Sequence, residues 1–334
     1  MNLMDTEIPQ MLSTENGSRF KKWLSVLGPF LGLAVVIGLF AVITGSPERY
    51  LSPSNIRIVL SQTVIVAISA IGMTVVIIAG GIDLSVGSTI ALSGVVTALS
   101  INAGIDPIIA VIAGMIVGGI VGVINGAIIT GLRVVPFIAT LGMLGIGRGV
   151  AKWVAHQEPV NTAPTWVNNL LVTFPDPWWL ILAPGIWIAI LLGVVMAFVL
   201  RGTVFGRRVF AIGSNEAAAR ACGIATNRLK IWIYGLAGLF FGLSGVMQMS
   251  RLRQGDPTVA AGTELDVIAA VVIGGGSLSG GQGTILGSVI GALVMAFLRN
   301  GCQQMGWPNY VQEIIIGAII IIAVAIDQVR IRRS

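Results

Sequence analysis

Ten apolar stretches, most of them about twenty residues long, follow one another along this 334-residue chain, and they constrain its fold more than any other feature. A helix of about twenty apolar residues is long enough to cross the hydrocarbon core of a bilayer. Only 10% of the residues are charged and the mean hydropathy is +0.92, which is typical of a polytopic membrane protein. We therefore predict an all-α membrane protein with about ten spans, near 24–44, 58–80, 86–104, 107–130, 135–153, 178–200, 231–250, 265–279, 284–299 and 311–326.

Lysine and arginine side chains lie mainly at the edges of the apolar stretches, where they orient the chain in the bilayer rather than bind nucleic acid. If the spans alternate in direction, both termini fall on the same side as thirteen of the twenty basic residues. Because the cytoplasmic side carries the excess of positive charge, we expect both termini in the cytoplasm. The chain then consists of a polar cytoplasmic tail over 1–20 and a single transmembrane domain over 21–330, with a cytoplasmic segment at 201–230.

Enzymatic chemistry has little support in this sequence. The spans hold no Ser/His, paired-Asp or HExxH arrangement, and the chain has no GxxxxGK[ST] loop to cradle a phosphate, so we predict neither an enzyme nor a chain that binds ATP. His156 has no second metal ligand near it, and Cys222 and Cys302 fall on opposite sides of the expected membrane, so no metal site is predicted. The few acidic residues form no cluster at mid-membrane depth, which disfavours a proton- or sodium-driven carrier.

A charged stretch, "GRRVFAIGSNEAAARACGI" at 206–224, interrupts the apolar sequence on the expected cytoplasmic side. Ser214 is placed to cap a helix, Glu216 stands near the positive end of its dipole, and Gly223 ends it after about two turns. Since so short a helix is marginal in water, we expect something to pack against it. The helix is either a solvated connection held by the spans or a contact for a partner.

Glycines mark a second unusual segment, "GGIDLSVG" at 80–87. Gly80, Gly81 and Gly87 permit backbone conformations that other residues avoid. Asp83 and Ser85 can satisfy the N–H groups that are released where a helix breaks. The segment therefore predicts a helix break near the cytoplasmic end of the second span, and this break is either purely structural or part of an inner gate. A weak echo of it occurs in "GGGSLSGGQG" at 274–283, the segment that divides the eighth and ninth spans and leaves their boundaries open.

Polar residues within otherwise apolar spans are candidates for lining a pathway through the membrane. A neutral solute would need hydroxyl and amide partners without a strong point charge. The same groups could equally form hydrogen bonds between packed helices. The candidates are Asn125, Thr130, Thr140 and Ser288.

Together these motifs identify a family. The charged stretch at 206–224 resembles the cytoplasmic coupling segment of bacterial ABC-importer permeases of the ribose, xylose and galactose type, which are related to branched-chain amino-acid permeases. "IIAGGIDLSVGS" at 77–88, "GVINGAIITGLRVVPFIATLGM" at 122–143 and "VIAAVVIGGGSLSGGQGTILGSVIGALV" at 267–294 resemble further signatures of that family, in the same order. The resemblance covers roughly 55–326.

The resemblance implies a permease subunit in the bacterial inner membrane that imports a monosaccharide as part of a larger assembly. The implied partners are a second permease copy in a homodimer, a separate ATPase subunit that binds ATP and magnesium, an extracytoplasmic sugar-binding protein and membrane lipid; no cofactor is implied for this chain. Contact with the ATPase would be made by Ser214, Glu216, Ala218, Ala219, Arg220 and Gly223. The sequence leaves open which sugar is carried, and whether the two permease copies are identical.

Four arginines stand at the expected outer ends of spans, where the positive-inside rule leaves few basic residues. They either snorkel to lipid phosphates or, as the resemblance implies, receive acidic residues of the binding protein. These residues are Arg57, Arg251, Arg253 and Arg299.

Two other functions remain as alternatives. Within the same family, the solute could be a branched-chain amino acid or a furanosyl signalling compound. Outside it, the chain could be a self-contained channel or a secondary carrier, and co-purification with an ATPase would distinguish that class from an ABC permease.

Overall fold

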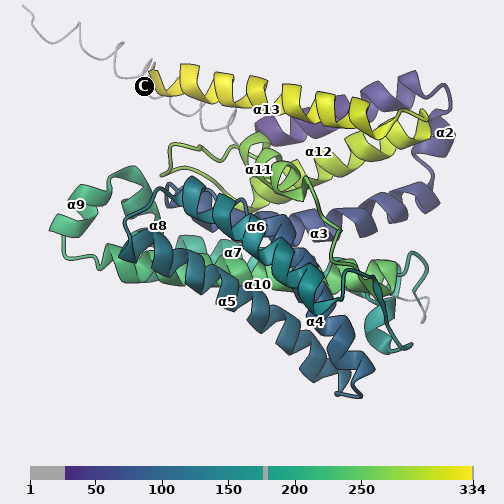
Figure 1. Ribbon diagram of the computed structural model, residues 1–334. Coiled ribbons are helices and arrows are strands. Elements are labelled where there is room, and N and C mark those ends of the chain that lie inside the picture. The colour runs from purple at the N-terminus through teal and green to yellow at the C-terminus, as the bar shows by residue number, and fades with distance from the viewer. Residues whose placement is uncertain (1–26, 176–179, 333–334) are drawn as a thin grey trace, which may run out of the picture.

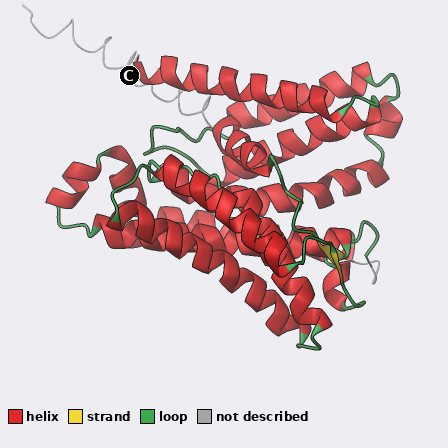
Figure 2. Cartoon of the chain, in the orientation of Figure 1, coloured by secondary structure: helices red, strands yellow, loops and turns green. Residues whose placement is uncertain are grey.

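Apolar runs of the sequence fold as α-helices in the computed structural model, which describes residues 27–175 and 180–332 (Figures 1 and 2). The polar tail at 1–20 and the first residues of the first and sixth expected spans lie outside the described residues. The helices are Leu27–Ile43, α2 (Pro47–Tyr50), α3 (Pro53–Ile78), α4 (Val86–Asn102), α5 (Pro107–Gly131), α6 (Pro136–Val154), α7 (Pro184–Gly202), α8 (Val204–Ser214), α9 (Glu216–Ala221), α10 (Thr226–Leu252), α11 (Thr263–Ile273), α12 (Ile285–Gln304) and α13 (Asn309–Arg332), with a 3₁₀ turn, η1 (Trp166–Asn169). Strands β1 (Val160–Asn161) and β2 (Gln254–Gly255) form an antiparallel pair.

Proline starts four of the long helices, namely α3, α5, α6 and α7. Its fixed φ suits the first helical position, where the missing N–H would have no partner within the helix. Side chains cap two of the same helices: the Ser52 hydroxyl accepts from the Asn55 N–H, and Asp106 accepts from the Ile108 N–H at 2.8 Å. The local sequence therefore sets where these helices begin.

Six helices of the described chain are long and apolar enough to cross a membrane, namely α3, α5, α6, α7, α10 and α12. Helix α3 lies in the middle of the bundle and packs against α7, α10, α11 and α12, so 89% of its most apolar stretch is buried. Helices α6 and α7 bury only 28% and 22% of theirs and leave large apolar side chains on the outside. The prediction of an all-α, polytopic membrane protein is confirmed.

Helices α5 and α10 approach so closely that glycine forms the contact. A Cβ on Gly118 would lie 2.7 Å from Cα of Gly242, and a Cβ on Gly242 would lie 2.9 Å from Cα of Met115. Membrane helices associate through such small residues because lipid offers no hydrophobic driving force between them.

The eighth expected span, 265–279, is wrong as a single helix. Helix α11 ends at Ile273 and has 11 residues, which is about 16 Å of helix against a hydrocarbon core of about 30 Å. The chain at 274–284 then forms turns and loop before α12 begins at Ile285. Glycine-rich sequence ends α11 early because its positive-φ residues, Gly275 and Gly280 among them, do not continue a helix.

The residues between the seventh and eighth expected spans, 251–264, would form an outer loop, but the connection from β2 to α11 instead runs back into the bundle beside α4 and α6 (Figure 1). At its start, a Cβ on Gly255 would lie 2.8 Å from Cβ of Ala98, near the end of α4. Five residues later, the Ala260 carbonyl lies against Gly87, at the start of α4. From Ala98 to Gly87 the segment therefore descends about 16 Å along α4. The Arg148 guanidinium of α6 donates to the carbonyls of Pro257 and Val259, at 2.8 and 2.5 Å. Irregular backbone at this depth is stable because protein groups satisfy it.

Candidate functional site

Helices α8 and α9 form a short arm that extends from one end of the bundle (Figure 1), which we call the α9 end. Helix α9 begins at Glu216, and the Asn215 side chain caps it by accepting from the Ala218 N–H at 2.9 Å. The predicted cap, Ser214, is instead the last residue of α8, so that prediction is wrong by one residue. Gly223 ends the helix as predicted: its φ is +81°, and the next N–H, of Ile224, donates to the Ala219 carbonyl.

The two central alanines of α9 differ in exposure. Ala219 is 5% exposed and packs toward the bundle, whereas Ala218 is exposed. Ala217, Arg220 and Ala221 are exposed as well, so the outward face is small and largely apolar with one positive charge. Ser214 and Gly223, which flank α9 on either side, are exposed as well.

Glu216 fastens α9 to the start of α10. Its carboxylate accepts from Lys230 at 2.7 Å and from Arg220, one turn away, at 3.0 Å. Partial burial acts to raise the pKa of Glu216, but the hydrogen bonds and charges of Lys230 and Arg220 outweigh it and hold this pKa below its ordinary value. The Glu216 side chain is 35% exposed, so the pairs orient α9 more than they stabilise the fold.

A helix break was predicted within 80–87, and the structure has it at 79–85, since α3 ends at Ile78 and α4 begins at Val86; Gly87 lies within α4. The fully buried Asp83 carboxylate accepts from the Ser85 N–H at 2.8 Å, from the Ser85 hydroxyl at 2.6 Å and from the Asn125 amide of α5 at 3.3 Å. Gly80 has φ +78°, and a Cβ on Gly81 would collide with the Tyr234 hydroxyl of α10. The break is therefore pinned between α5 and α10.

The glycine-rich segment at 274–283 lies against this break, and α8 touches both. The Gly281 N–H donates to the Ile78 carbonyl at 2.8 Å, which joins the end of α3 to the segment before α12. A Cβ on Gly213, near the end of α8, would collide with the same Ile78 carbonyl and lie 2.6 Å from the Gly281 nitrogen. A Cβ on Gly280 would lie 3.0 Å from Cα of Gly80. Three segments that are distant in sequence thus meet through main-chain atoms, and we call this contact the glycine junction.

The four candidate pathway residues all take part in hydrogen bonds within this one chain. Asn125 donates to Ser85 at 2.9 Å, and Thr140 of α6 accepts from the Leu84 N–H at 3.1 Å, so these two meet at the helix break. Ser288 of α12 accepts from Thr74 of α3 at 2.7 Å. Thr130 donates within α5 to the Gly126 carbonyl, apart from the other three.

At the end of the bundle opposite α9, the four arginines differ in their surroundings. Arg251 and Arg253 line a polar cavity of about 250 Å³ together with Ser61, Gln62 and Asn168.

Arg57 lies over the Phe174 ring, with its guanidinium carbon 5.5 Å from the ring centre. Arg299 donates to the buried Asp266 carboxylate at 2.6 Å and so ties α12 to α11. The Arg299 charge is therefore already paired within the chain.

Three residues that shape these sites were missed from the sequence, namely Asn215, Gly213 and Arg148. Asn and Ser cap helices equally well, so no local signal separates Asn215 from its neighbour Ser214. The roles of Gly213 and Arg148 depend on segments more than sixty residues away, and no local pattern indicates them. Within the described ranges, no three His, Cys, Asp or Glu side chains come together as metal ligands would.

Residues 55–324 match the model of the family described as "Branched-chain amino acid transport system / permease component". No solved structure matches the chain.

Curated relatives are similar over nearly their whole length. The ribose import permease protein of Escherichia coli strain K12 is 40% identical over 94% of this chain and 98% of the relative. The ribose import permease protein of Bacillus subtilis strain 168 is 41% identical over 97% of this chain and 99% of the relative. The L-arabinose ABC transporter permease protein of Azospirillum brasilense is 36% identical over 89% of this chain and 86% of the relative.

The extent of these matches and the six helices of the described ranges that are long and apolar enough to cross a membrane lead to one assignment. Permeases of bacterial ABC importers are inner-membrane proteins, and the helix break, the arm of α8 and α9 and the apolar bundle all lie within the matched residues. The chain belongs to the permease-component family of ABC importers that includes the ribose import permeases.

Proposed function

We propose that this chain is the membrane permease subunit of an ATP-driven importer for a monosaccharide such as ribose. The observation that carries the proposal is the similarity, over nearly their whole length, to permeases named for ribose and L-arabinose import. In this proposal the α9 end and both termini face the cytoplasm. The chain crosses the membrane ten times, and α11 with the irregular segment before it completes one crossing.

A separate ATPase subunit would dock on α9. The exposed face of Ala217, Ala218, Arg220 and Ala221 supports this proposal, because a small apolar surface with one charge suits a complementary groove better than open water. ATP and magnesium would bind to that partner, because this sequence has no phosphate-cradling loop. Movement of α9 would reach the helix break through the glycine junction.

A second copy of the chain would pack against α6. This helix leaves Gly142, Gly145 and Gly149 open on its surface, with nothing within 4 Å of a Cβ placed on any of them. Small residues at this spacing allow two membrane helices to approach closely. The solute pathway would then run between the copies, and the break at 79–85 would open as its inner gate. That gate would consist of Gly80, Gly81, Asp83, Ser85 and Gly87. The open pathway would be lined by Asn125, Thr130, Thr140 and Ser288.

The binding protein would dock at the opposite end. Among the described residues no ion pair holds Arg57, Arg251 or Arg253, so these three can receive acidic side chains, whereas Arg299 is held by Asp266. Such contacts mainly steer association and weaken with salt.

The test is solute uptake into proteoliposomes that contain the permease, its co-purifying ATPase and ATP, with the binding protein outside. We expect labelled ribose to accumulate only when all three proteins and ATP are present. The family description makes leucine the second candidate, and it is offered in parallel with a furanosyl compound. Accumulation of leucine but not of ribose would overturn the sugar assignment. Uptake without the ATPase would instead indicate a channel or a secondary carrier.

A further inference from the structure

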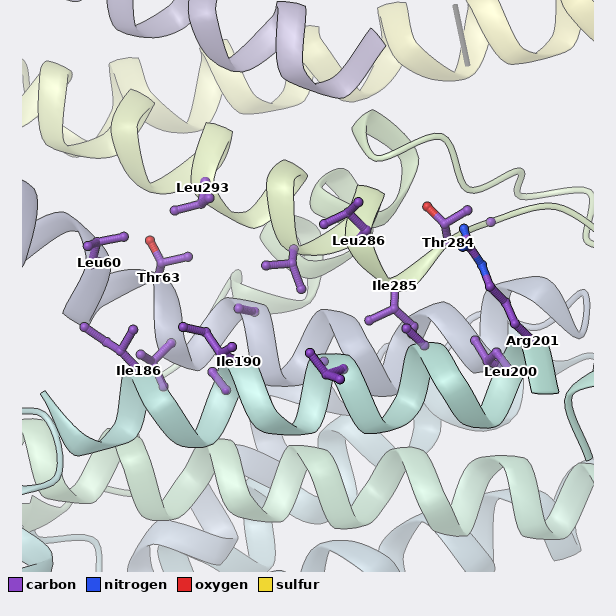
Figure 3. A pocket seen from close by; sticks show the side chains of 18 of the residues that line it. Leu60, Thr63, Ile186, Ile190, Leu200, Arg201, Thr284, Ile285, Leu286 and Leu293 are labelled. Carbon is purple, nitrogen blue, oxygen red and sulfur yellow. The ribbon is translucent and has the colours of Figure 1, made fainter. Parts of the chain in front are cut away.

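An apolar groove of about 530 Å³ runs along the bundle between α3, α7 and α12 (Figure 3). Its floor includes Ala189, Gly193 and Ala197, which are spaced four residues apart and therefore share one face of α7. A Cβ placed on Gly193 would make ordinary contacts at 3.8 to 4.0 Å with Ile71, Ile285 and Val289, so glycine at this position widens the groove by about one methyl group. Leu60 of α3 and Leu293 of α12 stand along its walls.

The groove lies at membrane depth and opens on the outer surface of the bundle. Helix α7 is long and apolar enough to cross a membrane, and Ile190 and Val194, which line the groove, are 49% and 64% exposed. From Ile186 to Arg201 the groove follows about 22 Å of helix, a large part of a hydrocarbon core about 30 Å thick. An apolar groove in this position is suited to a lipid tail rather than to water.

One charged residue stands at the α9 end of this groove. The Arg201 side chain extends from the last turn of α7 toward Thr284, the capping residue of α12, and both residues line the groove (Figure 3). Within the described part of the chain, no carboxylate forms an ion pair with Arg201. As a basic residue in the last turn of α7, Arg201 complements the helix dipole. The dipole does not explain why an apolar groove leads to this residue.

We propose that the groove binds one anionic phospholipid, with an acyl chain along α7 and the phosphate at Arg201. Basic pockets between membrane helices bind anionic headgroups in this way, and the guanidinium matches a phosphate in geometry as well as in charge. Phe210 of α8 also lines the groove, so the bound lipid contacts the first helix of the arm that leads to α9. The proposal does not depend on which solute is carried or on whether an ATPase docks.

Native mass spectrometry of the purified permease tests the proposal. Phosphatidylglycerol and phosphatidylcholine with identical acyl chains are added in equal amounts. We expect preferential retention of phosphatidylglycerol, and we expect Arg201→Gln to reduce this preference about fivefold, the effect of one basic residue near an anionic surface. Arg228→Gln is the matched control, because Arg228 is an exposed arginine near the same end that does not line the groove.

A second variant and a measurement on the unaltered protein complete the test. Gly193→Phe places an aromatic ring in the middle of the groove and should reduce retention of both lipids, while thermal unfolding shows whether the variant remains folded. A photoreactive phosphatidylglycerol should label peptides of α7 and α12 in the unaltered chain. Equal retention of the two lipids, the same loss in Arg228→Gln as in Arg201→Gln, or labelling confined to other helices would overturn the proposal.

Discussion

The opposite exposure of Ala218 and Ala219 separates docking on α9 from its folding. We expect Ala218→Glu to leave the permease folded, because an exposed substitution usually changes stability by less than about 0.5 kcal/mol. If Ala218 enters a groove of the ATPase, the new carboxylate is desolvated there without a partner. A loss of about 2 kcal/mol, typical of a hot-spot contact, weakens ATPase binding about thirtyfold.

Ala219→Glu should behave in the opposite way. Ala219 is 5% exposed within the permease itself, so a carboxylate there is buried in the free chain and lowers its thermal unfolding temperature. Asn227→Glu is the control, since it adds the same charge to an exposed position just beyond α9. Interferometry with the immobilised permease gives the ATPase affinity. The docking argument is refuted if Ala218→Glu binds the ATPase as tightly as Asn227→Glu does.

Three further predictions concern the junction, the arm and the break. Gly213→Ala should lower the free energy of unfolding by about 1–3 kcal/mol through overpacking, and it should abolish stimulation of ATP hydrolysis by the loaded binding protein. Gly131→Ala is the control and should change neither quantity, because its Cβ meets open space. Equal stimulation in the two variants would exclude the junction from coupling. Because the pKa of Glu216 is lowered from 4.5, its ion pairs persist above that value and are lost as the pH falls through the lowered pKa. Hydrogen-exchange protection of α9 should therefore stay constant down to about pH 5. Below that pH, the free energy of opening of α9 should fall by less than about 1 kcal/mol. A loss of protection near neutral pH would contradict this. Asp83→Ala should lower the free energy of unfolding by at least about 2 kcal/mol, because the buried donors of Ser85 and Asn125 lose their acceptor. Asp83→Asn should lower it by less, because one oxygen remains. An Ala variant as stable as the unaltered chain would disprove the role of Asp83 as the acceptor at the break.

Features that depend on local sequence were predictable. Apolar length located the helices, and glycine with Asp83 located the break, because both signals lie within a few residues of their effect. The segment after β2 was not predictable, since "RLRQGDP" at 251–257 is polar enough for an outer loop. It enters the bundle because Arg148, more than one hundred residues earlier, holds its carbonyls.

The same limit applies to the candidate site. The composition of α9 indicated a helix at a surface, but only its packing against α8 and α10 decides that Ala219 is buried and Ala218 exposed. Likewise, Arg299 is paired because α11 packs against α12 and brings Asp266 beside it. Each of these contacts joins separate elements and has no signature within either one.

The glycine junction also determines how faithfully a displacement passes through the protein. A contact between two side chains can absorb a small shift by changing rotamers, which takes place in picoseconds to nanoseconds at exposed sites. The Ile78 carbonyl, the Gly281 N–H and the backbone of Gly213 have no rotamers to change. When α8 shifts, the end of α3 and the segment before α12 must therefore move with it, or the contacts of the junction break. The junction thus transmits a displacement of α8 as a rigid unit.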